Sequence, residues 1–231
     1  GRNHLIRKNN DPLSDIEDKL LAVRKKRSQP SVDTKILCGT NALAASAMIQ
    51  AGRFLDKPEL RIKAEGIINK LIKIFWDGST LGHSYYNGTI QKQSFLSDAG
   101  ALLTAVTMLY ERNEEWKVTM DSFSKYVESF RENGKWIESK SDDFIAVDAS
   151  WTDQPVPSAV SLAETGLTRY AMLTGKEVKA VPYRRVLQSD FYNINALMCN
   201  DLFHVYTTKL PLSWKADWRC SCHLLRLCLL Y

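Results

Sequence analysis

Hydrophobic residues recur at helical spacing through most of the chain. The strongest pattern runs from Leu60 to Phe75, where apolar side chains follow the three-and-four rhythm of an amphipathic helix for four turns. Similar spacing predicts further helices at about 11–28, 41–55, 95–110, 116–130 and 158–174, and a weaker one at 189–206. The pattern therefore predicts an all-α chain.

Two stretches interrupt the helical spacing. Between residues 81 and 95, aromatic residues flank Asn87-Gly88, which predicts a short β-hairpin with a two-residue turn. The stretch 135–157 mixes apolar residues with turn formers and predicts a long loop with one or two short strands.

Polar and small residues mark expected helix ends. We expect Ser14 to cap the first helix. Asn133-Gly134 and Gly175 are expected to close the helices at 116–130 and 158–174, because glycine and asparagine accept the left-handed conformation found after many helices.

One unit occurs three times: a polar stretch that carries an aspartate, followed by a helix rich in small and aliphatic residues. The three aspartates are Asp33, Asp98 and Asp153. Each interval between them is long enough for two antiparallel helices and two connections. The repeat predicts stacked helical hairpins whose polar starts recur on one side.

Composition places the chain among ordinary globular proteins. It has 231 residues, of which 45% are hydrophobic and 25% charged, with a net charge of +5. The basic run Arg24–Arg27 fits either a solvated helix end or a nucleic-acid or nuclear-localisation patch; we favour the helix end and expect no nucleic-acid partner. The first twenty residues are too polar for a secretory signal, and no long apolar run occurs, so we expect a cytoplasmic protein without a membrane partner.

Cysteine spacing gives no metal site. Cys38 and Cys199 stand alone in apolar surroundings, as buried free thiols do. Residues 218–231 form an atypical tail rich in cysteine and leucine, set apart from a domain at 1–217. Its possible ligands match no strong zinc pattern: Cys220, Cys222, His223 and Cys228. No nucleotide-binding loop or metalloprotease motif is present, so we expect no cofactor.

Ordered motifs give the chain a family resemblance. They are Leu20-Leu-Ala22 with Arg24 and Arg27; Pro30, Asp33 and Lys35; Asn41 with Leu43; Tyr86-Asn-Gly88; Phe95-Leu-Ser-Asp98; Leu109-Tyr110-Glu111; and Asp153 before Pro157-Ser158. In this order they resemble the helical barrel region of thioredoxin-domain-containing proteins of the bacterial and spermatogenesis-associated type. The resemblance covers roughly residues 1–176 and continues more weakly to about Pro211.

This resemblance implies an (α/α) toroid, similar to that of N-acylglucosamine 2-epimerases and six-hairpin glycosidases. It also implies a thioredoxin-like domain upstream, since Gly1-Arg2-Asn3 resembles the point where that domain hands over to the barrel. The toroid is then expected to be incomplete. Its open edge would expose apolar helix faces and favour self-association.

The chain departs from the family pattern at three helix starts. Thr40 and Ala42 replace a tryptophan and a glycine, Ser97 replaces an aspartate, and Ala159-Val160 replaces Gly-Asn. Each change removes a polar or conformationally permissive group, so any activity that depended on these groups is affected.

Three residues are candidates for catalysis: His83, Asp98 and Asp153. Two carboxylates that flank a sugar can act as general acid and base, and a histidine can move the proton next to a carbonyl, as epimerisation requires. The alternatives are structural. Aspartates before helices cap free backbone N–H groups, and a single histidine is often a packing or surface residue.

Candidate substrate-binding residues complete the expected site. Asp33 and Lys35 are expected to pair across a loop, and Asn41 to bind a backbone carbonyl or a ligand hydroxyl. Aromatic faces for sugar stacking, or else core packing, come from Tyr85, Tyr86, Trp136 and Trp151, and Ser158 stands before the last helix of the repeat.

Two functions are open. The first, implied by the resemblance, is carbohydrate binding or modification of the epimerase or glycosidase type, whereas the changed helix starts favour the second. The alternative is a non-catalytic scaffold that presents targets to a thioredoxin-like module, because resemblance supports a fold more firmly than an activity.

Overall fold

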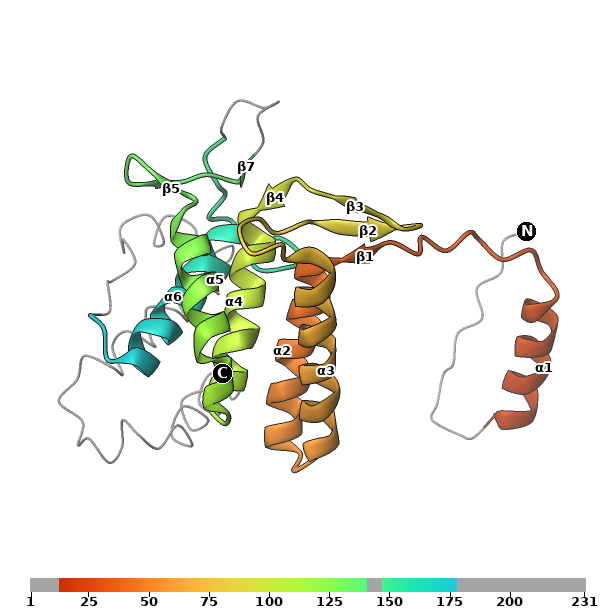
Figure 1. Cartoon of the computed structure of the whole chain (residues 1–231). Helices are drawn as coiled ribbons and strands as arrows, with labels where there is room; N and C mark the ends of the chain where they lie inside the picture. Colours follow the sequence, from red (N-terminus) through yellow and green to blue (C-terminus); the bar gives the residue numbers. More distant parts are fainter. Residues whose placement is uncertain (1–12, 141–146, 178–231) are drawn as a thin grey trace. The chain divides into compact units, whose positions relative to one another are not determined.

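The computed structural model describes residues 13–140 and 147–177 and is mostly helical, as the sequence predicts (Figure 1). The chain divides into two compact units, Gly1–Thr34 and Lys35–Tyr231. The first unit holds helix α1 (Ser14–Lys25), and the second holds every other helix and strand of the described residues. No helix within the described ranges is both long and apolar enough to cross a membrane.

Helix α1 is shorter than its hydrophobic pattern predicts. Leu13 occupies the N-cap position without a side-chain capping bond, and Ser14, which we expected as the cap, is instead the first helical residue. Acidic residues occupy the first turn and basic residues the last, which suits the helix dipole. None of its residues is buried.

The described part of the second unit contains five helices: α2 (Cys38–Phe54), α3 (Pro58–Phe75), α4 (Leu96–Tyr110), α5 (Lys117–Glu128) and α6 (Ala159–Thr174). A 3-10 turn, Glu114–Trp116, precedes α5. Sequence signals for helix ends are confirmed in α6, where Ser158 Oγ accepts the Ser161 N–H and Gly175 follows with φ 68°. Helix α2 starts earlier than predicted, at Cys38.

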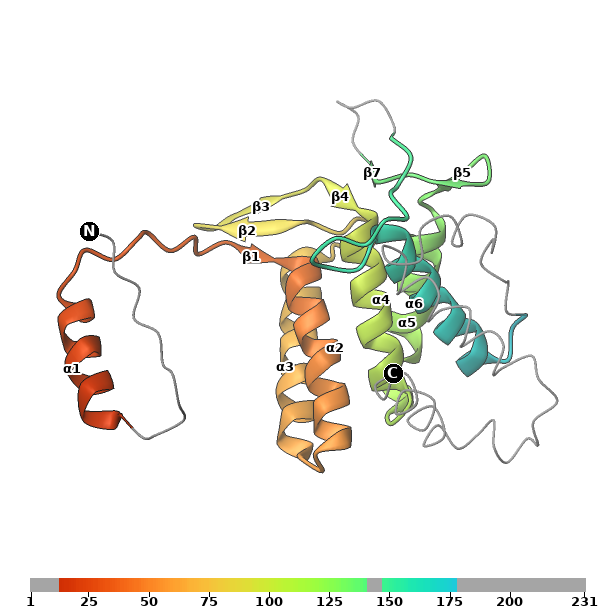
Figure 2. The ribbon, with the colours of Figure 1, turned by 180° about the vertical axis from the view of Figure 1, so that it is seen from behind.

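Helices α2 and α4 run parallel to each other. Gly39 and Asp98 meet near the two helix starts, and Arg53 lies 3.7 Å from Glu111 near the two ends. Helices α4 and α6 are also parallel: Gly100 lies against the backbone of Ala163 near both starts, and Arg169 Nε donates to Thr107 Oγ1 over 2.9 Å towards both ends. The three helices therefore form a row with α4 in the middle (Figure 2).

Helices α3 and α5 run in the opposite direction and pack beside this row. A short connection joins α2 to α3, with the Lys57 N–H donating to Gly52 O over 2.8 Å. Tyr170, in the second half of α6, donates to Asp121 Oδ1, in the first half of α5, over 2.9 Å. The helices thus stack as antiparallel hairpins, and the three small-residue helices of the sequence repeat are the parallel row.

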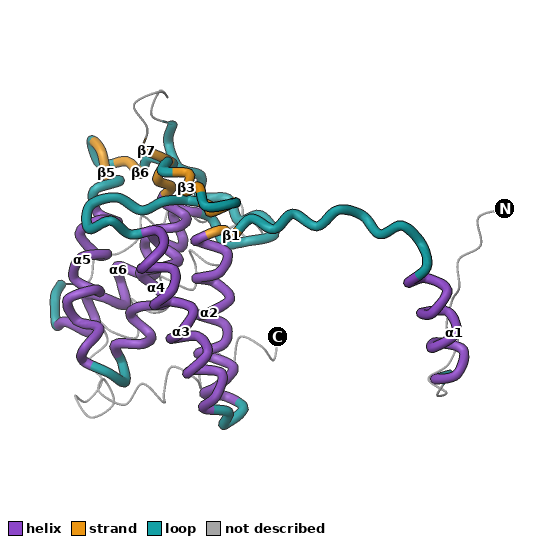
Figure 3. The backbone as a smooth tube through the Cα atoms, turned by 45° about the vertical axis from the view of Figure 1, so that its right-hand side comes forward, coloured by secondary structure: helices purple, strands orange, loops and turns teal. Residues whose placement is uncertain are grey.

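A three-stranded antiparallel sheet lies at the end of the unit where α2 and α4 begin (Figure 3). Its strands are β1 (Ile36–Leu37), β2 (Ser84–Tyr86) and β3 (Thr89–Gln91), in that order. The predicted turn is confirmed, since Asn87 and Gly88 have φ of 47° and 83°. Strand β1 was not predicted, because two residues are too few to show alternation.

Four more short strands connect the helices at this end. Strand β4 (Ser94–Phe95) pairs with β7 (Ser139–Lys140), and β5 (Arg131–Glu132) pairs with β6 (Lys135–Trp136). The prediction that Asn133-Gly134 closes the preceding helix is wrong. Helix α5 ends at Glu128, and Asn133-Gly134 forms the β5–β6 turn, where both residues take positive φ (48° and 77°) as a tight hairpin requires.

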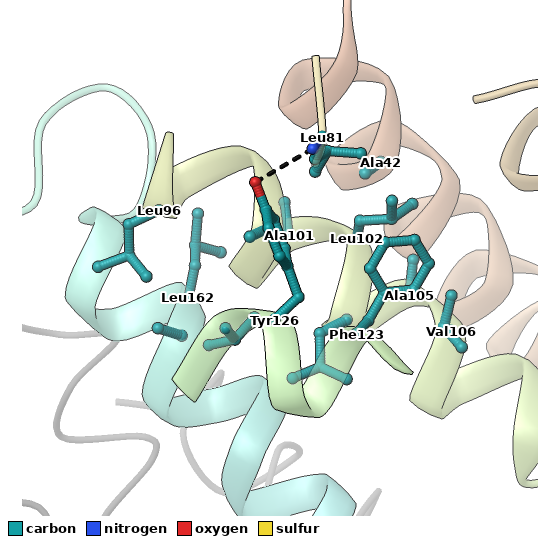
Figure 4. Close-up of a cluster of buried hydrophobic side chains, with 14 of the residues drawn as sticks. Ala42, Leu81, Leu96, Ala101, Leu102, Ala105, Val106, Phe123, Tyr126 and Leu162 are labelled. Carbon is teal, nitrogen blue, oxygen red and sulfur yellow. Dashed lines mark hydrogen bonds between the residues drawn. The ribbon is translucent and has the colours of Figure 1, made fainter. Parts of the chain in front are cut away.

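The hydrophobic core surrounds α4, which is buried on nearly all sides (Figure 4). Its Leu102 and Val106 pack with Phe123 of α5 and Leu162 of α6 in one core cluster. A helix that is apolar all round belongs in the centre of a bundle, which explains why α4 lacks the one-sided pattern of α3.

One polar contact inside this core gives a stability prediction. The Tyr126 hydroxyl accepts the buried N–H of Leu81 over 3.1 Å. We expect Tyr126→Phe to lower the free energy of unfolding by about 1–2 kcal/mol, because the Leu81 N–H loses its partner in a dry environment. Urea denaturation followed by circular dichroism would measure this change. The matched variant Tyr86→Phe alters an exposed side chain and should stay within about 0.5 kcal/mol of wild type.

Several sequence predictions lie outside the described residues. They are the helix at 189–206, the free thiol of Cys199, the boundary at 217/218 and the cysteine-rich tail 218–231.

Candidate functional site

A buried carboxylate, Asp98, joins three segments at the strand-covered end of the second unit. Its Oδ1 accepts the Gly39 N–H over 2.7 Å, and its Oδ2 lies 2.7 Å from His83 Nδ1. Only 4% of the Asp98 side chain is exposed. The repeat pattern put Asp98 ahead of its helix, but α4 begins at Leu96 and Asp98 lies in the first turn.

Asp98 provides a hydrogen-bond acceptor at the start of helix α2. The first N–H groups of a helix have no partners within the helix and carry partial positive charge. Helix α2 has Leu37 at its N-cap, without a side-chain capping bond. The carboxylate from α4 therefore supplies the acceptor, which links the starts of the two parallel helices.

The position of His83 is set by backbone bonds on both sides. Its N–H donates to Gln91 O, and its carbonyl accepts the Cys38 N–H, each over 2.9 Å. Its ring packs against Phe95, with 4.7 Å between centroids. The contacts with Phe95 and Asp98 orient the imidazole. The side chain is 29% exposed, so part of the ring is accessible from solvent.

The bond to Asp98 also selects the tautomer of His83. An ionised carboxylate only accepts hydrogen bonds, so the proton of the bond lies on Nδ1. In the neutral ring, Nε2 is then left with a lone pair that can take a proton. A histidine held in this way by a carboxylate is suited to general acid and base chemistry.

Burial dominates the electrostatics of this site. It raises the pKa of Asp98 above the ordinary value, although the hydrogen bond and charge of His83 and the Gly39 N–H act in the opposite direction. Burial also raises the pKa of the Cys38 thiol, and the charge of Asp98 adds to this effect. Cys38 is thus a protonated buried thiol, as its apolar surroundings in the sequence predict.

Sequence analysis missed Gly39, which the site requires. A Cβ at this position would lie 2.6 Å from Asp98 Oδ1. The predicted helix started at Asn41, which left Gly39 in a connection of no apparent importance. The available signal was a glycine directly before the small-residue helix, next to the buried Cys38.

We expect Gly39→Ala to disturb both stability and the His83 contact. The new methyl group must displace the buried carboxylate, which should cost about 1–3 kcal/mol of unfolding free energy. Urea denaturation measures this cost, and the imidazole resonances of His83 should shift in the NMR spectrum. The neighbouring exposed variant Thr40→Ala should change the free energy by no more than about 0.5 kcal/mol. An unchanged His83 resonance in Gly39→Ala would contradict the close contact.

The other catalytic candidate, Asp153, serves the start of α6. Its Oδ1 accepts the Ser158 N–H over 2.9 Å, and the Ser158 hydroxyl in turn caps the helix. Ser158 is buried. The structure therefore brings together His83 and Asp98 of the three candidates and gives Asp153 and Ser158 the structural task that we considered as the alternative.

The aromatic candidates differ in how much of each ring is open. Tyr86 is exposed, whereas Tyr85 and Trp151 are partly buried against the core. Trp136 is enclosed: its Nε1 donates to Glu164 Oε1 over 2.8 Å, and the Arg131 guanidinium covers its ring at 3.9 Å. Trp136 is therefore a core residue, which is one of the two roles that the sequence left open for these aromatic residues.

The remaining binding candidates come from the segment that precedes α2 in the sequence and from the first turn of α2. Asn41 donates through Nδ2 to Leu37 O over 2.8 Å, which confirms the expected bond to a backbone carbonyl. Asp33 is an exposed residue of the first unit, and Lys35 is the exposed first residue of the second.

Metal ligands do not gather in the part of the chain that the structure describes: no group of three or more His, Cys, Asp or Glu side chains is placed to hold an ion there. Comparison of the sequence with models of known protein families gives no match, and a search of curated proteins gives no significant match.

Proposed function

We propose that the second unit is an arc of an (α/α) toroid and that it binds a carbohydrate at the end where its parallel helices begin. The alternation of a parallel row (α2, α4, α6) with antiparallel partners (α3, α5) supports the arc. In such an arrangement, loops before the parallel helices gather at one mouth, where residues distant in sequence can share a ligand.

The His83–Asp98 pair carries the functional half of this proposal. Epimerisation removes and returns a proton next to a carbonyl, and His83 would be the group that takes it at Nε2. Asp98 would hold the ring and stabilise the imidazolium that forms, at a distance of 2.7 Å. The partial exposure of His83 allows a ligand to reach it.

Aromatic rings of the connections would provide the binding energy. Tyr86, three residues after His83 at the end of β2, is exposed and would offer its ring to the apolar face of a sugar. Tyr85, Lys35 and Trp151 are further candidates from the same set of connections. The chain differs from the family pattern at Thr40, Ala42, Ser97, Ala159 and Val160. The proposed chemistry therefore uses only His83 and Asp98.

A two-step experiment tests this function. Ligand-observed NMR of the chain with aldoses, ketoses and N-acyl amino sugars would identify a bound sugar. Proton exchange at the carbon next to the carbonyl would then be followed in deuterated water. We expect His83→Gln to bind the sugar but to lose the exchange. Binding without any exchange in the wild type would limit the function to carbohydrate binding, and no binding by folded protein would refute the proposal.

A second candidate function is a non-catalytic scaffold for a thioredoxin-like module. The engagement of Asp153 and Ser158 at the start of α6 favours it, because these side chains already have structural partners. Chemical-shift changes on addition of a thioredoxin-like domain, with no sugar bound, would support this function.

Self-association through an open edge stays a prediction of the incomplete toroid. Apolar side chains with 50–70% of their surface exposed surround the connection between α2 and α3: Phe54, Leu55 and Ile62. Light scattering across a concentration series would test it, and Ile62→Glu should reduce any association that uses this edge.

A further inference from the structure

Glu138 brings a second partly buried carboxyl group to the end of the second unit where α4 begins. Its carbonyl accepts the N–H of Leu96, the first residue of α4, over 3.0 Å, and its own N–H donates to Val147 O over 2.9 Å. The backbone of Glu138 is therefore held on both sides, next to the helix turn that carries Asp98.

The contacts of Phe95, the N-cap residue of α4, connect Glu138 with His83. The Phe95 ring lies 4.7 Å from the His83 ring between centroids, and its Cα pairs with that of Ser139, the residue after Glu138. Strands β4 and β7, which make this pairing, lie at the end where α4 begins (Figure 1). The fold thus gathers an imidazole and two carboxyl groups around one helix start, although they come from three different segments of the sequence.

The surroundings of the Glu138 carboxyl group favour its protonated form. Burial raises the pKa of Glu138 above the ordinary value, and a hydrogen bond from the Ser150 N–H acts in the opposite direction. A protonated carboxyl group has one oxygen that accepts and one that carries a proton. The Ser150 N–H binds to the accepting oxygen, and the O–H is the donor for a ligand. A carboxylic acid kept protonated by burial donates to a substrate oxygen in this way in known enzymes.

The charged groups on the neighbouring described segments have other partners. Lys140, two residues further along, donates through Nζ to Ser129 Oγ over 2.6 Å, beyond the end of α5. Asp148, on the segment that pairs beside Glu138, accepts from Lys135 Nζ over 2.8 Å. These contacts leave burial as the larger cause of the pKa shift of Glu138.

We propose that Glu138 is the general acid of the candidate site and that the substrate is an aldose or ketose in its open-chain carbonyl form. This inference rests on the proposed function and names the group that works together with His83. In the reaction, His83 Nε2 takes the proton from the carbon next to the carbonyl. The electron pair of that C–H bond forms a C=C bond, and the carbonyl oxygen takes the proton of Glu138. Reversal of these steps returns both protons, so neither side chain is changed overall.

Proton exchange in deuterated water tests this role with the sugar identified for the wild type. We expect Glu138→Gln to bind the sugar but to slow the exchange by about 100-fold or more, because an amide can donate a hydrogen bond but cannot transfer a proton. Lys140→Met is the matched control. It removes a polar group that is directed to Ser129 and should leave the rate within about twofold of the wild-type value.

The pH dependence of the exchange distinguishes an acid from a structural residue. The wild-type rate should fall as the pH rises through the raised pKa of Glu138, because the carboxyl group then loses the proton that it donates. Glu138→Gln should lack this decline. Its amide oxygen still accepts the Ser150 N–H, so its midpoint of urea denaturation should match that of the wild type. A Glu138→Gln variant that lost stability but kept the decline at high pH would overturn the proposal.

Failure of this inference differs from failure of the proposed function. Exchange that is lost in His83→Gln but retained in Glu138→Gln would overturn the role of Glu138 and leave the proposed function standing. A wild-type chain that binds the sugar without any exchange would refute the proton transfer itself, and with it the role of Glu138.

Discussion

Gly100→Ala should destabilise the second unit more than any other single-methyl addition considered for this chain. A Cβ at position 100 would lie 2.6 Å from the backbone nitrogen of Ala163 and 2.8 Å from the carbonyl carbon of Leu162. These atoms belong to the main chain of α6, so no side-chain rotation can make room. Helices α4 and α6 would have to separate, at an expected loss of about 2–4 kcal/mol of unfolding free energy.

Gly66→Ala is the matched control for this prediction. Gly66 is an exposed residue within α3, and nothing lies within 4 Å of a Cβ built there. Alanine restricts the unfolded chain and favours the helix, so this variant should gain about 0.5–1 kcal/mol. Urea denaturation would compare the two variants. A similar change in both would contradict the close approach of α4 to α6.

Asp98→Asn should abolish proton transfer at His83 while the fold remains. The amide oxygen can still accept the Gly39 N–H, but the amide nitrogen is a donor and would require the unprotonated state at His83 Nδ1. The proton then moves to Nε2, which can no longer act as a base. If His83 catalyses the proposed exchange, its rate should fall by roughly 10²–10⁴-fold, as measured in deuterated water with the sugar identified for the wild type.

The same variant should show a distinct dependence of stability on pH. Burial raises the pKa of Asp98 in the folded state above its ordinary unfolded value, so the folded chain binds this proton more tightly. The stabilisation from Asp98 is full below the ordinary value, about 4, and is lost as the pH rises through the raised pKa. Asparagine removes this loss, so Asp98→Asn should become more stable relative to wild type as the pH increases.

Asp98→Ala separates the charge from the hydrogen bonds. It removes the acceptor of the buried Gly39 N–H, so Asp98→Ala should be less stable than Asp98→Asn by about 1–3 kcal/mol at every pH, since neither side chain titrates. Unfolding of wild type and both variants at pH 4, 6 and 8 would test the comparison. If Asp98→Asn and Asp98→Ala had the same free energy of unfolding at pH 8, the hydrogen bond to the Gly39 N–H would not stabilise the fold.

Local signals in the sequence were sufficient for most of the helices and for one turn. Periodicity predicted α3 to within two residues, and Asn87-Gly88 predicted its hairpin turn, because both depend on neighbouring residues only. Asn133-Gly134 shows the limit of such signals. The same dipeptide chemistry fits a helix end and a hairpin turn, and only the pairing of β5 with β6 distinguishes them.

The sequence predicted two residues of the candidate site but not the contacts between them. His83 and Asp98 were predicted as catalytic residues from their types and from the resemblance to a family, which itself stays a prediction. Their contact was not predicted, and neither was Gly39, which is 59 residues from Asp98 in the chain. Asp153 occupies the same position of the repeat as Asp98, but it accepts a hydrogen bond from the start of the helix that follows it, whereas Asp98 accepts one from a neighbouring helix.

The sequence by itself determined that the chain is mostly helical, where most helices run and which helices are rich in small residues. These properties follow from the spacing of hydrophobic residues and from the conformational preferences of individual residues, both of which act within a few helical turns. The tertiary structure alone decided that α4 packs between α2 and α6 and that Asp98 reaches both Gly39 and His83. That arrangement depends on close helix packing at positions such as Gly100, where the backbone of α6 leaves no room for a side chain. The sequence shows the glycine but does not show which backbone lies against it.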